Sequence, residues 1–238
     1  MKGNILIIGA SGDIGSAIAI KLGNEGYQLL LHYHKNVDKI NHIRSQLKSD
    51  SILSEIQADL SENNGIKRLI SAVVFKVDHI VFAGGHAYYS LLQETSEKIM
   101  DEMLTIHVKA PMLITKHLLP SMIQQKFGNI VVISSIWGET GASMEVIYST
   151  VKGAQNSFVE SLAKEIKTSG ISINAISPGF IDTKMNQHLS NIEREVIVQS
   201  IPLKRAGSPY DIAHSVSFLI NQPSNHIHGQ IIGVDGAW

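Results

Sequence analysis

Cysteine is absent from the 238 residues of this sequence. Its absence excludes disulfide bonds, thiolate metal sites and a cysteine nucleophile, and it agrees with a reducing compartment. Long apolar runs are lacking too. No stretch of about 18 apolar residues predicts a membrane span, and the apolar run near the N-terminus is too short for a secretory signal. We therefore expect a cytoplasmic protein.

Neither sign of charge is in excess. The chain has 20 Lys and Arg residues against 21 Asp and Glu residues, and its net charge is −1. This balance creates no overall field that would attract nucleic acid or an anionic membrane, and we expect neither as a partner. Apolar residues are plentiful: they make up 44% of the chain, enough for the core of one α/β domain spanning residues 1–238.

Strand-like apolar runs alternate with amphipathic helical stretches along the whole chain. Strict alternation predicts βαβ crossovers, and therefore a doubly wound parallel sheet of about seven strands with helices on both faces. The predicted strands are 5–8, 28–33, 51–57, 78–82, 129–134, 172–177 and 230–234. The predicted helices are 14–25, 37–48, 65–74, 96–124, 147–168 and 209–219. One long excursion, residues 180–205, interrupts the alternation and is predicted to be a lid.

Three glycines spaced by threes, Gly9, Gly12 and Gly15, follow the first predicted strand and precede a helix. Glycines permit a tight turn and close backbone approach, and a helix N-terminus attracts phosphate, so this context favours a nucleotide-binding loop over a plain strand-to-helix turn. Asp13 stands where a carboxylate would repel a pyrophosphate. We expect it to cap the helix instead.

Two further segments bear on the nucleotide. Asp59, after the third predicted strand, is either the cap of the next helix, which we favour from this residue alone, or an acceptor for adenine. The second strand ends with Tyr33, His34 and Lys35 and no acid. An acid here typically binds the ribose 2′-hydroxyl of NAD, whereas a cation accommodates a 2′-phosphate, so this turn favours NADPH over a merely solvated role.

The stretch of residues 131–154, VVISSIWGETGASMEVIYSTVKGA, contains the groups for hydride-transfer chemistry. Tyr148 and Lys152 are four residues apart on a predicted helix and so share one face. An ammonium nearby favours tyrosinate and is expected to lower the phenol pKa toward a useful acid–base range. Ser135, at the end of a strand, is placed to polarise a carbonyl oxygen.

With these motifs in place, the sequence resembles the short-chain dehydrogenase/reductase family over essentially its whole length. The motifs GASGDIG, ADL, ISS, YSTVK, NAISPGFIDTKM, IPLKRAGSPYDIA and GQIIGVDGAW occur in order and at family spacing. The resemblance implies a Rossmann fold and reduction of a carbonyl with NADPH. It makes Tyr148 the general acid, Lys152 the group that lowers its pKa and binds the nicotinamide ribose, and Ser135 the donor to the substrate oxygen.

The same resemblance implies a set of cofactor contacts. Asp59 becomes an adenine contact, four residues after the sixth strand cradle the nicotinamide, and the segment from Phe180 to Arg205 becomes the substrate lid. The full predicted cofactor set, besides Tyr148 and Lys152, is Gly9, Ser11, Gly12, Asp13, Ile14, Gly15, Tyr33, His34, Lys35, Asp59, Leu60, Ala83, Gly84, Gly85, Pro178, Gly179, Ile181 and Thr183.

Two departures from the family pattern stand out. The family's NNAG is here FAGG, residues 82–85, which replaces two bracing asparagines and leaves the backbone to line the adenosine. His107 stands where the family has an asparagine whose main-chain carbonyl helps to hold a water on the proton path to the lysine. His107 either keeps that carbonyl and relays protons itself, or is a packed helix residue in a weakened enzyme. A nucleotide-binding regulator or scaffold without catalysis is the alternative from another class.

The substrate is open between two ketones. Carbonyl reductases of the 3-oxoacyl-[acyl-carrier-protein] type share the overall pattern and dock their carrier on a basic surface; here Lys126, Lys164 and Lys167 supply positive charge, while Ser169 stands where that group commonly has a basic residue. This reductase type is our first expectation.

Residues beside the catalytic serine and tyrosine suggest the other ketone. Trp137, Glu139 and Glu145 lie where the family often lines its substrate pocket, and an indole with carboxylates can hold an ammonium group. The same run resembles bacterial reductases of a 5-aminopentanone modification on elongation factor P. The alternative is that Trp137 packs and both glutamates are solvated.

Assembly and metal binding complete the sequence-based expectations. Apolar positions on the long helices, such as Met112 and Phe158, are core or, as the resemblance implies, are buried in a homotetramer or homodimer, where the C-terminal GVDGAW could reach a neighbouring subunit. The histidines of HYH and HIH lack a convergent ligand at metal-binding spacing, so we expect no metal site.

Overall fold

The computed structural model describes residues 2–187, 189–221 and 226–238, and its centre is one parallel sheet. Seven strands lie side by side in the order β3-β2-β1-β4-β5-β6-β7. Their bounds are β1 Asn4–Ile8, β2 Gln28–Tyr33, β3 Ile52–Gln57, β4 His79–Phe82, β5 Gly128–Ile133, β6 Ile171–Pro178 and β7 Ile231–Val234. All seven predicted strands are confirmed, with ends that differ by at most one residue.

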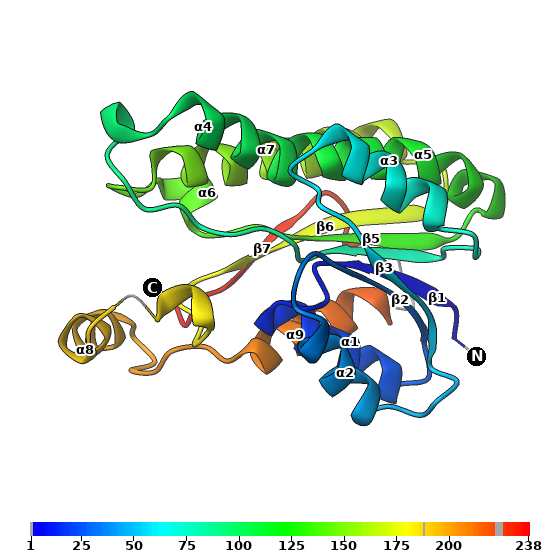
Figure 1. Ribbon diagram of the computed structural model, residues 1–238, viewed down its shortest axis with the longest axis horizontal. Coiled ribbons are helices and arrows are strands. Elements are labelled where there is room, and N and C mark those ends of the chain that lie inside the picture. Colours follow the sequence, from blue (N-terminus) through cyan, green and yellow to red (C-terminus); the bar gives the residue numbers. More distant parts are fainter. Residues whose placement is uncertain (1, 188, 222–225) are drawn as a thin grey trace.

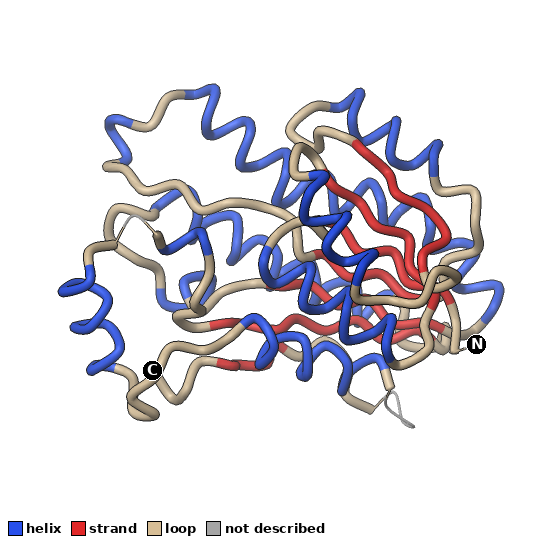
Figure 2. The backbone as a smooth tube through the Cα atoms, turned by 60° about the horizontal axis from the view of Figure 1, so that its bottom comes forward, coloured by secondary structure: helices blue, strands red, loops and turns tan. Residues whose placement is uncertain are grey.

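Helices cover both faces of the sheet (Figures 1 and 2), which confirms the doubly wound Rossmann arrangement. One face carries α1 (Asp13–Asn24), α2 (Val37–Ser45) and α9 (Pro209–Ile220). The other carries α3 (Asn63–Ala72), α4 (Glu97–Leu104), α5 (Ala110–Gln125) and α7 (Val146–Glu165), with the single turn α6 (Trp137–Thr140) at its end. Within the described ranges, no helix is long and apolar enough to cross a membrane.

The central strands are apolar throughout because both of their faces are buried. In β1, Ile5 and Ile7 pack into the core on the side of α1 and α9, whereas Leu6 and Ile8 pack into the core on the side of α5 and α7. All four are at most 4% exposed. This two-sided burial is typical of parallel sheets and explains why the strands read as continuous apolar runs rather than as alternating ones.

The chain reverses its direction across the sheet next to β1, whose neighbours are β2 and β4. Ligands bind at such a switch point, at the carboxyl ends of the strands. Gly9 follows β1 there with φ +80°, and a Cβ on it would lie 2.4 Å from the Cα of Gly84, which follows β4. Two strand ends therefore meet where only glycine backbone fits.

The glycine loop leads into α1, but Asp13 does not cap that helix as predicted. The N-cap is Gly12, and Asp13 is the first helical residue. Its carboxylate instead accepts hydrogen bonds from the backbone N–H of Lys184 at 2.8 Å and from Lys39 Nζ at 3.2 Å. The prediction failed because these partners lie far away in the sequence.

The predicted helix 96–124 is divided into three parts: α4, the π-helical segment η2 (Thr105–Lys109) and α5. Pro111 at the start of α5 has no N–H to donate to the carbonyl four residues earlier, which disturbs the regular ladder. The predicted lid is not a plain loop either. It contains the single turn η3 (Lys184–Asn186) and the helix α8 (Asn191–Ser200), which begins with a capping box between Ser190 and Glu193; its residue 188 lies outside the described ranges.

The glycine loop gives a test of the fold. Gly9→Ala should lower the free energy of unfolding by about 1–3 kcal/mol, because alanine is strained at this φ and its Cβ collides with backbone. Gly12→Ala is the matched control: Gly12 has φ −77°, and the nearest atom to its Cβ is 3.4 Å away. Urea unfolding should leave Gly12→Ala near the parent protein, and an equal loss in both variants would contradict the account.

Candidate active site

Three predicted catalytic side chains meet at the carboxyl end of β5. Ser135 follows this strand, and Tyr148 and Lys152 lie one turn apart near the start of α7. The side chains of Ser135 and Tyr148 are hydrogen-bonded to each other, and Lys152 Nζ lies 5.5 Å from the centre of the Tyr148 ring. All three residues are at most 9% exposed. The spacing of the motifs therefore placed these groups together correctly.

The electrostatic state of Tyr148 differs from the expectation. Burial raises the pKa of its hydroxyl, the Ser135 hydrogen bond lowers it only in part, and the charge of Glu145 raises it further. The predicted lowering of this pKa by Lys152 was wrong for the protein by itself. The reason is that both groups are buried. Burial disfavours the charged form of each group by more than the attraction between the two charges would stabilise it.

Lys152 is held by two acceptors. Its Nζ donates to the main-chain carbonyl of Ile133 at 2.8 Å and to Gln155 Oε1 at 3.1 Å. Burial lowers the Lys152 pKa to about 7. A lysine with this pKa near neutrality can both hold and release a proton under ordinary conditions.

His107 lies in η2, with its ring edge-on to Tyr148 at 5.9 Å between centroids. The Nε2 of this ring is 3.0 Å from the main-chain carbonyl of His86, to which it donates. Burial, and then the charge of Lys152, lower the His107 pKa well below its usual value, so the ring is neutral at pH 7. A Cβ on Gly85 would lie 2.2 Å from the ring, so the FAGG segment makes room for this histidine. These contacts favour a packed ring over a ring that relays protons.

The main chain of His107 is also occupied. Its carbonyl accepts a hydrogen bond from Gln155 Nε2 at 2.8 Å, where the family resemblance had suggested a water. Gln155 was not among the predicted site residues. The signal that could have found it is its position seven residues after Tyr148 and three after Lys152, which puts an uncharged polar side chain on the same helix face.

A cavity of about 270 Å³ opens above the switch point. Its floor is the glycine-loop backbone and the ends of β1 and β4, and Gly85 connects it to the ring of His107. Of the predicted cofactor residues, those lining it are Gly9, Ser11, Gly12, His34, Asp59, Leu60, Ala83, Gly84 and Gly85. Its place at the switch point, with apolar side chains and a few polar groups in its lining, is typical of a small-molecule site.

His32 was noticed only as part of a turn, but it is a buried residue of β2 at this cavity. Its Nδ1 accepts from the N–H of Gly9 at 3.1 Å, and its Nε2 donates to the carbonyl of Ala58 at 3.0 Å. Burial lowers its pKa to about 4, so the ring is neutral and fixes the glycine loop. Its position directly after three apolar residues of β2, in a strand buried on both faces, could have signalled a buried histidine.

Asp59 does not cap α3, whose N-cap is Glu62. The Asp59 carboxylate accepts from the N–H and hydroxyl of Ser61 at 2.9 and 2.7 Å, and it lies 3.3 Å from His34 Nε2. Burial favours a raised Asp59 pKa, but the Ser61 hydrogen bonds and the charges of His34 and Lys35 outweigh it and lower the pKa. Lys35 is exposed beside this pair, and Tyr33 packs against the core.

The predicted nicotinamide cradle follows β6. Gly179 packs so closely on Asp235 that a Cβ would lie 2.8 Å from its Cα, and Pro178 accepts from the N–H of Ile136 at 3.1 Å. Ile181 and Thr183 continue toward Lys184, whose N–H is bound by Asp13. The Asp13 carboxylate thus joins the start of α1, next to Ile14 and Gly15, to the start of the predicted lid.

An aromatic pair flanks the catalytic serine. The rings of Trp137 and Trp238 meet edge to face at 5.3 Å, and the backbone N–H of Trp137 donates to Ser135 Oγ at 3.3 Å. The predicted pocket residue Glu139 is exposed and accepts from Ser177 Oγ at 3.0 Å, while Glu145 acts electrostatically on Tyr148. The C-terminal residue therefore lies beside the site of its own chain.

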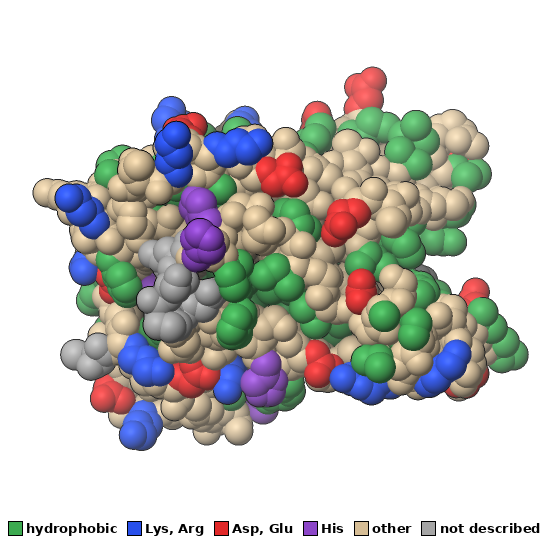
Figure 3. Space-filling view, turned by 180° about the vertical axis from the view of Figure 1, so that it is seen from behind, with side chains coloured by type: hydrophobic (Ala, Val, Ile, Leu, Met, Phe, Trp, Pro, Cys, Tyr) green, Lys and Arg blue, Asp and Glu red, His purple; other side chains and the backbone are tan. Residues whose placement is uncertain are grey.

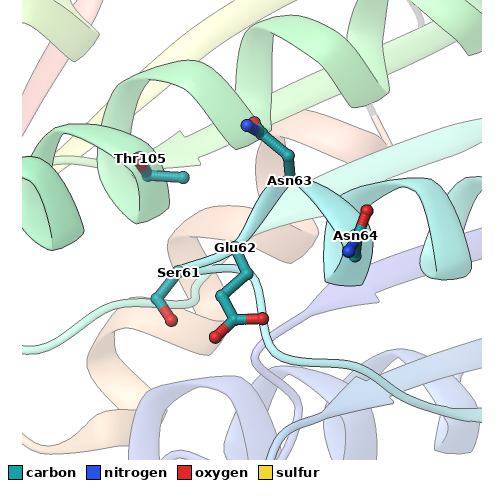
Figure 4. A pocket seen from close by; sticks show the side chains of 5 residues that line it. All are labelled: Ser61, Glu62, Asn63, Asn64 and Thr105. Carbon is teal, nitrogen blue, oxygen red and sulfur yellow. The ribbon is translucent and has the colours of Figure 1, made fainter.

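Two other hollows adjoin this region. Figure 3 shows a notch between the body and the lobe that carries α8. A hollow of about 400 Å³ lies between the start of α3 and η2 (Figure 4), and Thr105 faces it from η2. Its lining is polar, Glu62 and Asn64 are exposed, and it contains none of the catalytic groups. Its lining residues are Ser61, Glu62, Asn63, Asn64 and Thr105.

Comparison with known proteins identifies the family. A family model described as enoyl-(acyl carrier protein) reductase matches residues 9–237. The chain belongs to the short-chain dehydrogenase/reductase family. Among curated relatives, this short-chain dehydrogenase/reductase is 43% identical to "uncharacterized oxidoreductase YmfI" of Bacillus subtilis (strain 168), with 100% of this chain and 99% of the relative covered. It is 32% identical to the 3-oxoacyl-[acyl-carrier-protein] reductase FabG of Staphylococcus epidermidis (strain ATCC 12228 / FDA PCI 1200), covering 99% and 98%.

Solved structures agree with this assignment. One neighbour is a proposed NAD(P)-dependent gluconate 5-dehydrogenase from Beutenbergia cavernae with NADP bound at low occupancy, at a TM-score of 0.92, 25% identity and coverage of 99% of this chain and 96% of that one. A 3-oxoacyl (acyl-carrier-protein) reductase from Agrobacterium tumefaciens C58 matches at a TM-score of 0.90 with 24% identity, covering 99% and 94%, and supports the fold. This short-chain dehydrogenase/reductase thus has the fold of the family's oxidoreductases. Membership of the family implies a nicotinamide cofactor.

The buried histidines of this short-chain dehydrogenase/reductase predict sensitivity to acid. Burial lowers the pKa of His79, as it does that of His32, to about 4, so the unfolded chain binds protons first on acidification. Above pH 6.5 such a histidine does not lower the free energy of unfolding. As the pH falls from 6.5 toward 4, each one lowers this free energy by about 1.4 kcal/mol per pH unit. His79 packs edge-on between Tyr27 and Phe127, away from the active site, so His79→Phe should flatten this loss in urea unfolding measured from pH 7 to 4.5. Parallel curves for the two proteins would contradict the prediction.

Proposed function

We propose that this chain is an NADPH-dependent reductase of ketones. The observation that carries the proposal is the buried hydrogen bond between Tyr148 and Ser135, with Lys152 one turn further along α7. Two neighbouring hydroxyl groups can both donate to a carbonyl oxygen, and the neighbouring lysine has a pKa of about 7. We also propose that residues 1–238 form a single domain.

The residues present fit a dinucleotide. The cavity at the switch point is lined by loop backbone at Gly9, Ser11 and Gly12, and α1 begins there with its N–H groups available to phosphate. A Cβ on Gly12 would meet no atom closer than 3.4 Å. Packing within the protein therefore does not require glycine at this position, whereas close approach of a phosphate would. When bound, NADPH would supply the hydride to the carbonyl carbon.

The protein's own groups would supply the rest of the reaction. Ser135 donates a hydrogen bond to the substrate carbonyl oxygen and orients it. Tyr148, neutral because its pKa is raised, gives its proton to that oxygen as negative charge develops there. Lys152 holds the ribose side of the site and stabilises the tyrosinate left behind, since an ammonium nearby favours the charged phenolate.

His34 and Lys35 support the preference for NADPH. Both come at or directly after the end of β2, His34 lines the cavity, and no acid occupies the turn. The pairing of His34 with Asp59 at 3.3 Å keeps the imidazole near the position where a 2′-phosphate is read in such sites.

The first candidate substrate is a 3-oxoacyl group on acyl carrier protein, as in the relatives named FabG. The expected docking lysines, however, lie at the amino edge of the sheet: Lys126 precedes β5, and Lys164 and Lys167 precede β6. Along α7, Lys164 lies 16 residues after Tyr148, a separation of about 24 Å. A carrier docked there would lie far from the active site of the same chain, so this route needs the homotetramer or homodimer that the family resemblance implies.

A ketone that carries an ammonium group is the second candidate, as in the 5-aminopentanone modification of elongation factor P. The contact between Trp137 and Trp238 beside Ser135 favours it, because indole faces attract ammonium groups. The carboxylates of Glu139 and Glu145 add negative charge to the same end of the site. The contacts at the site thus support the aminoketone more directly than the thioester.

Tyr148→Phe tests the reaction class. NADPH oxidation, followed by absorbance with either ketone, should fall by roughly 10²–10⁴-fold because the proton donor is lost, while NADPH still quenches tryptophan fluorescence. Tyr210→Phe, an exposed tyrosine on α9, is the matched control and should retain activity. NADH should support slower turnover than NADPH in the parent protein. NADPH binding without turnover in the parent protein would instead indicate a nucleotide-binding regulator or scaffold.

Trp238→Leu tests the substrate. With the elongation factor P aminoketone, kcat/KM should fall about tenfold or more, since a desolvated cation–π contact contributes about 2 kcal/mol. With an acetoacetyl thioester the change should be small. Equal losses with both ketones would mean that the aromatic pair is only a packing contact, and turnover of the thioester alone in the parent protein would favour the acyl carrier protein branch.

A further inference from the structure

Gln155 is a buried amide in α7 that faces the catalytic groups. It is 3% exposed, and both ends of its side chain are bound. Nε2 donates to the His107 carbonyl at 2.8 Å, and Oε1 accepts from Lys152 Nζ at 3.1 Å. A buried amide is costly unless its partners are satisfied, so this pairing fixes the side chain in one orientation.

The His107 carbonyl is available for this bond because of the local sequence. In a regular helix it would accept from the N–H of the residue four positions later, but that residue is Pro111, which has none. The π-helical segment η2 therefore presents this carbonyl sideways to α7. Gln155 completes a bridge between two elements that also meet through the packing of His107 on Tyr148 and of Val108 on the cluster around Val151.

We propose that Gln155 is a positioning residue that holds the Lys152 ammonium in its working orientation by tying it to the main chain of η2. Two of the three ammonium N–H groups point to Ile133 and Gln155, which leaves the third for the cofactor and Tyr148 side. The titratable groups that face the ammonium are Tyr148 on its own helix and the neutral His107 on η2; β5 contributes a main-chain carbonyl. This role adds a positioning residue to the proposed ketone reduction, and its importance for catalysis rests on that proposed function.

The two ends of the amide allow opposite substitutions. Gln155→Glu keeps an oxygen against Lys152 and adds a negative charge, which should raise the pKa of Lys152 by at least about one pH unit. Gln155→Leu keeps the side chain's approximate size but removes the acceptor from a buried ammonium, which should lower this pKa. A residue that only fills space would give no such pair of opposite shifts.

The first measurement is an NMR titration of the lysine side chains in the full chain without cofactor or substrate, with Lys152 assigned by Lys152→Arg. We expect the Lys152 titration to move upward in Gln155→Glu and downward in Gln155→Leu. Asn156→Leu is the matched control: this neighbouring buried amide binds Ser134 Oγ at 2.6 Å, so its loss should reduce the melting temperature without moving Lys152. Shifts in the same direction, or none in a folded Gln155→Glu protein, would overturn the proposal.

The second measurement is the pH dependence of kcat with NADPH and the better ketone. The basic limb should move in the same direction as the Lys152 titration in each variant, with kcat reduced more than KM is raised. Because the NMR titration requires no turnover, a protein that reduces neither ketone would refute the proposed function and still leave the positioning of Lys152 testable. Moved titrations with unmoved basic limbs would overturn the positioning role in catalysis.

Discussion

The active site depends on the burial of one ammonium group. Lys152 lies under the site where β5, α7 and η2 converge, and its hydrogen-bond partners in the described chain include no carboxylate. A buried cation without an ion pair persists only if its N–H groups are matched to acceptors. The Ile133 carbonyl and the Gln155 amide meet that need, and Pro111 makes the second connection possible by freeing the His107 carbonyl.

At the proposed nucleotide site, close packing requires residues without side chains. Gly9 and Gly84 bring the ends of β1 and β4 within backbone contact, and Gly85 leaves room for the His107 ring. The crowding that requires these glycines therefore also links the two halves of the site. It explains why the chain tolerates FAGG: the bracing function of asparagine side chains is taken by packing, because Phe82 is 3% exposed and belongs to the core on the α5 side.

Sequence patterns predicted the sheet well because each strand is buried on both faces and reads as an apolar run. The catalytic trio could be placed because Tyr148 and Lys152 share a helix face by spacing alone. The capping predictions for Asp13 and Asp59 failed because capping rules use only neighbouring residues in the sequence. Asp13 binds Lys184 and Lys39, and Asp59 pairs with His34, all of which are distant in the sequence. The helix α8 was missed although Ser190 and Glu193 form a capping box, since its apolar residues, such as the exposed Ile192 and Val196, do not mark a buried face. The raised Tyr148 pKa reflects depth of burial, which a sequence does not contain.

The short path from β2 to the glycine loop has a consequence for redesign of cofactor preference. Under the proposed preference for NADPH, changes at His34 and Lys35 would affect a half-exposed and an exposed side chain, so coenzyme preference could be altered there with little disturbance of packing. His32, two positions earlier, holds the Gly9 N–H and the Ala58 carbonyl together. Engineering that crosses this boundary changes the shape of the phosphate loop itself, so a mutational library for the coenzyme should begin at residue 34 and leave residue 32 constant.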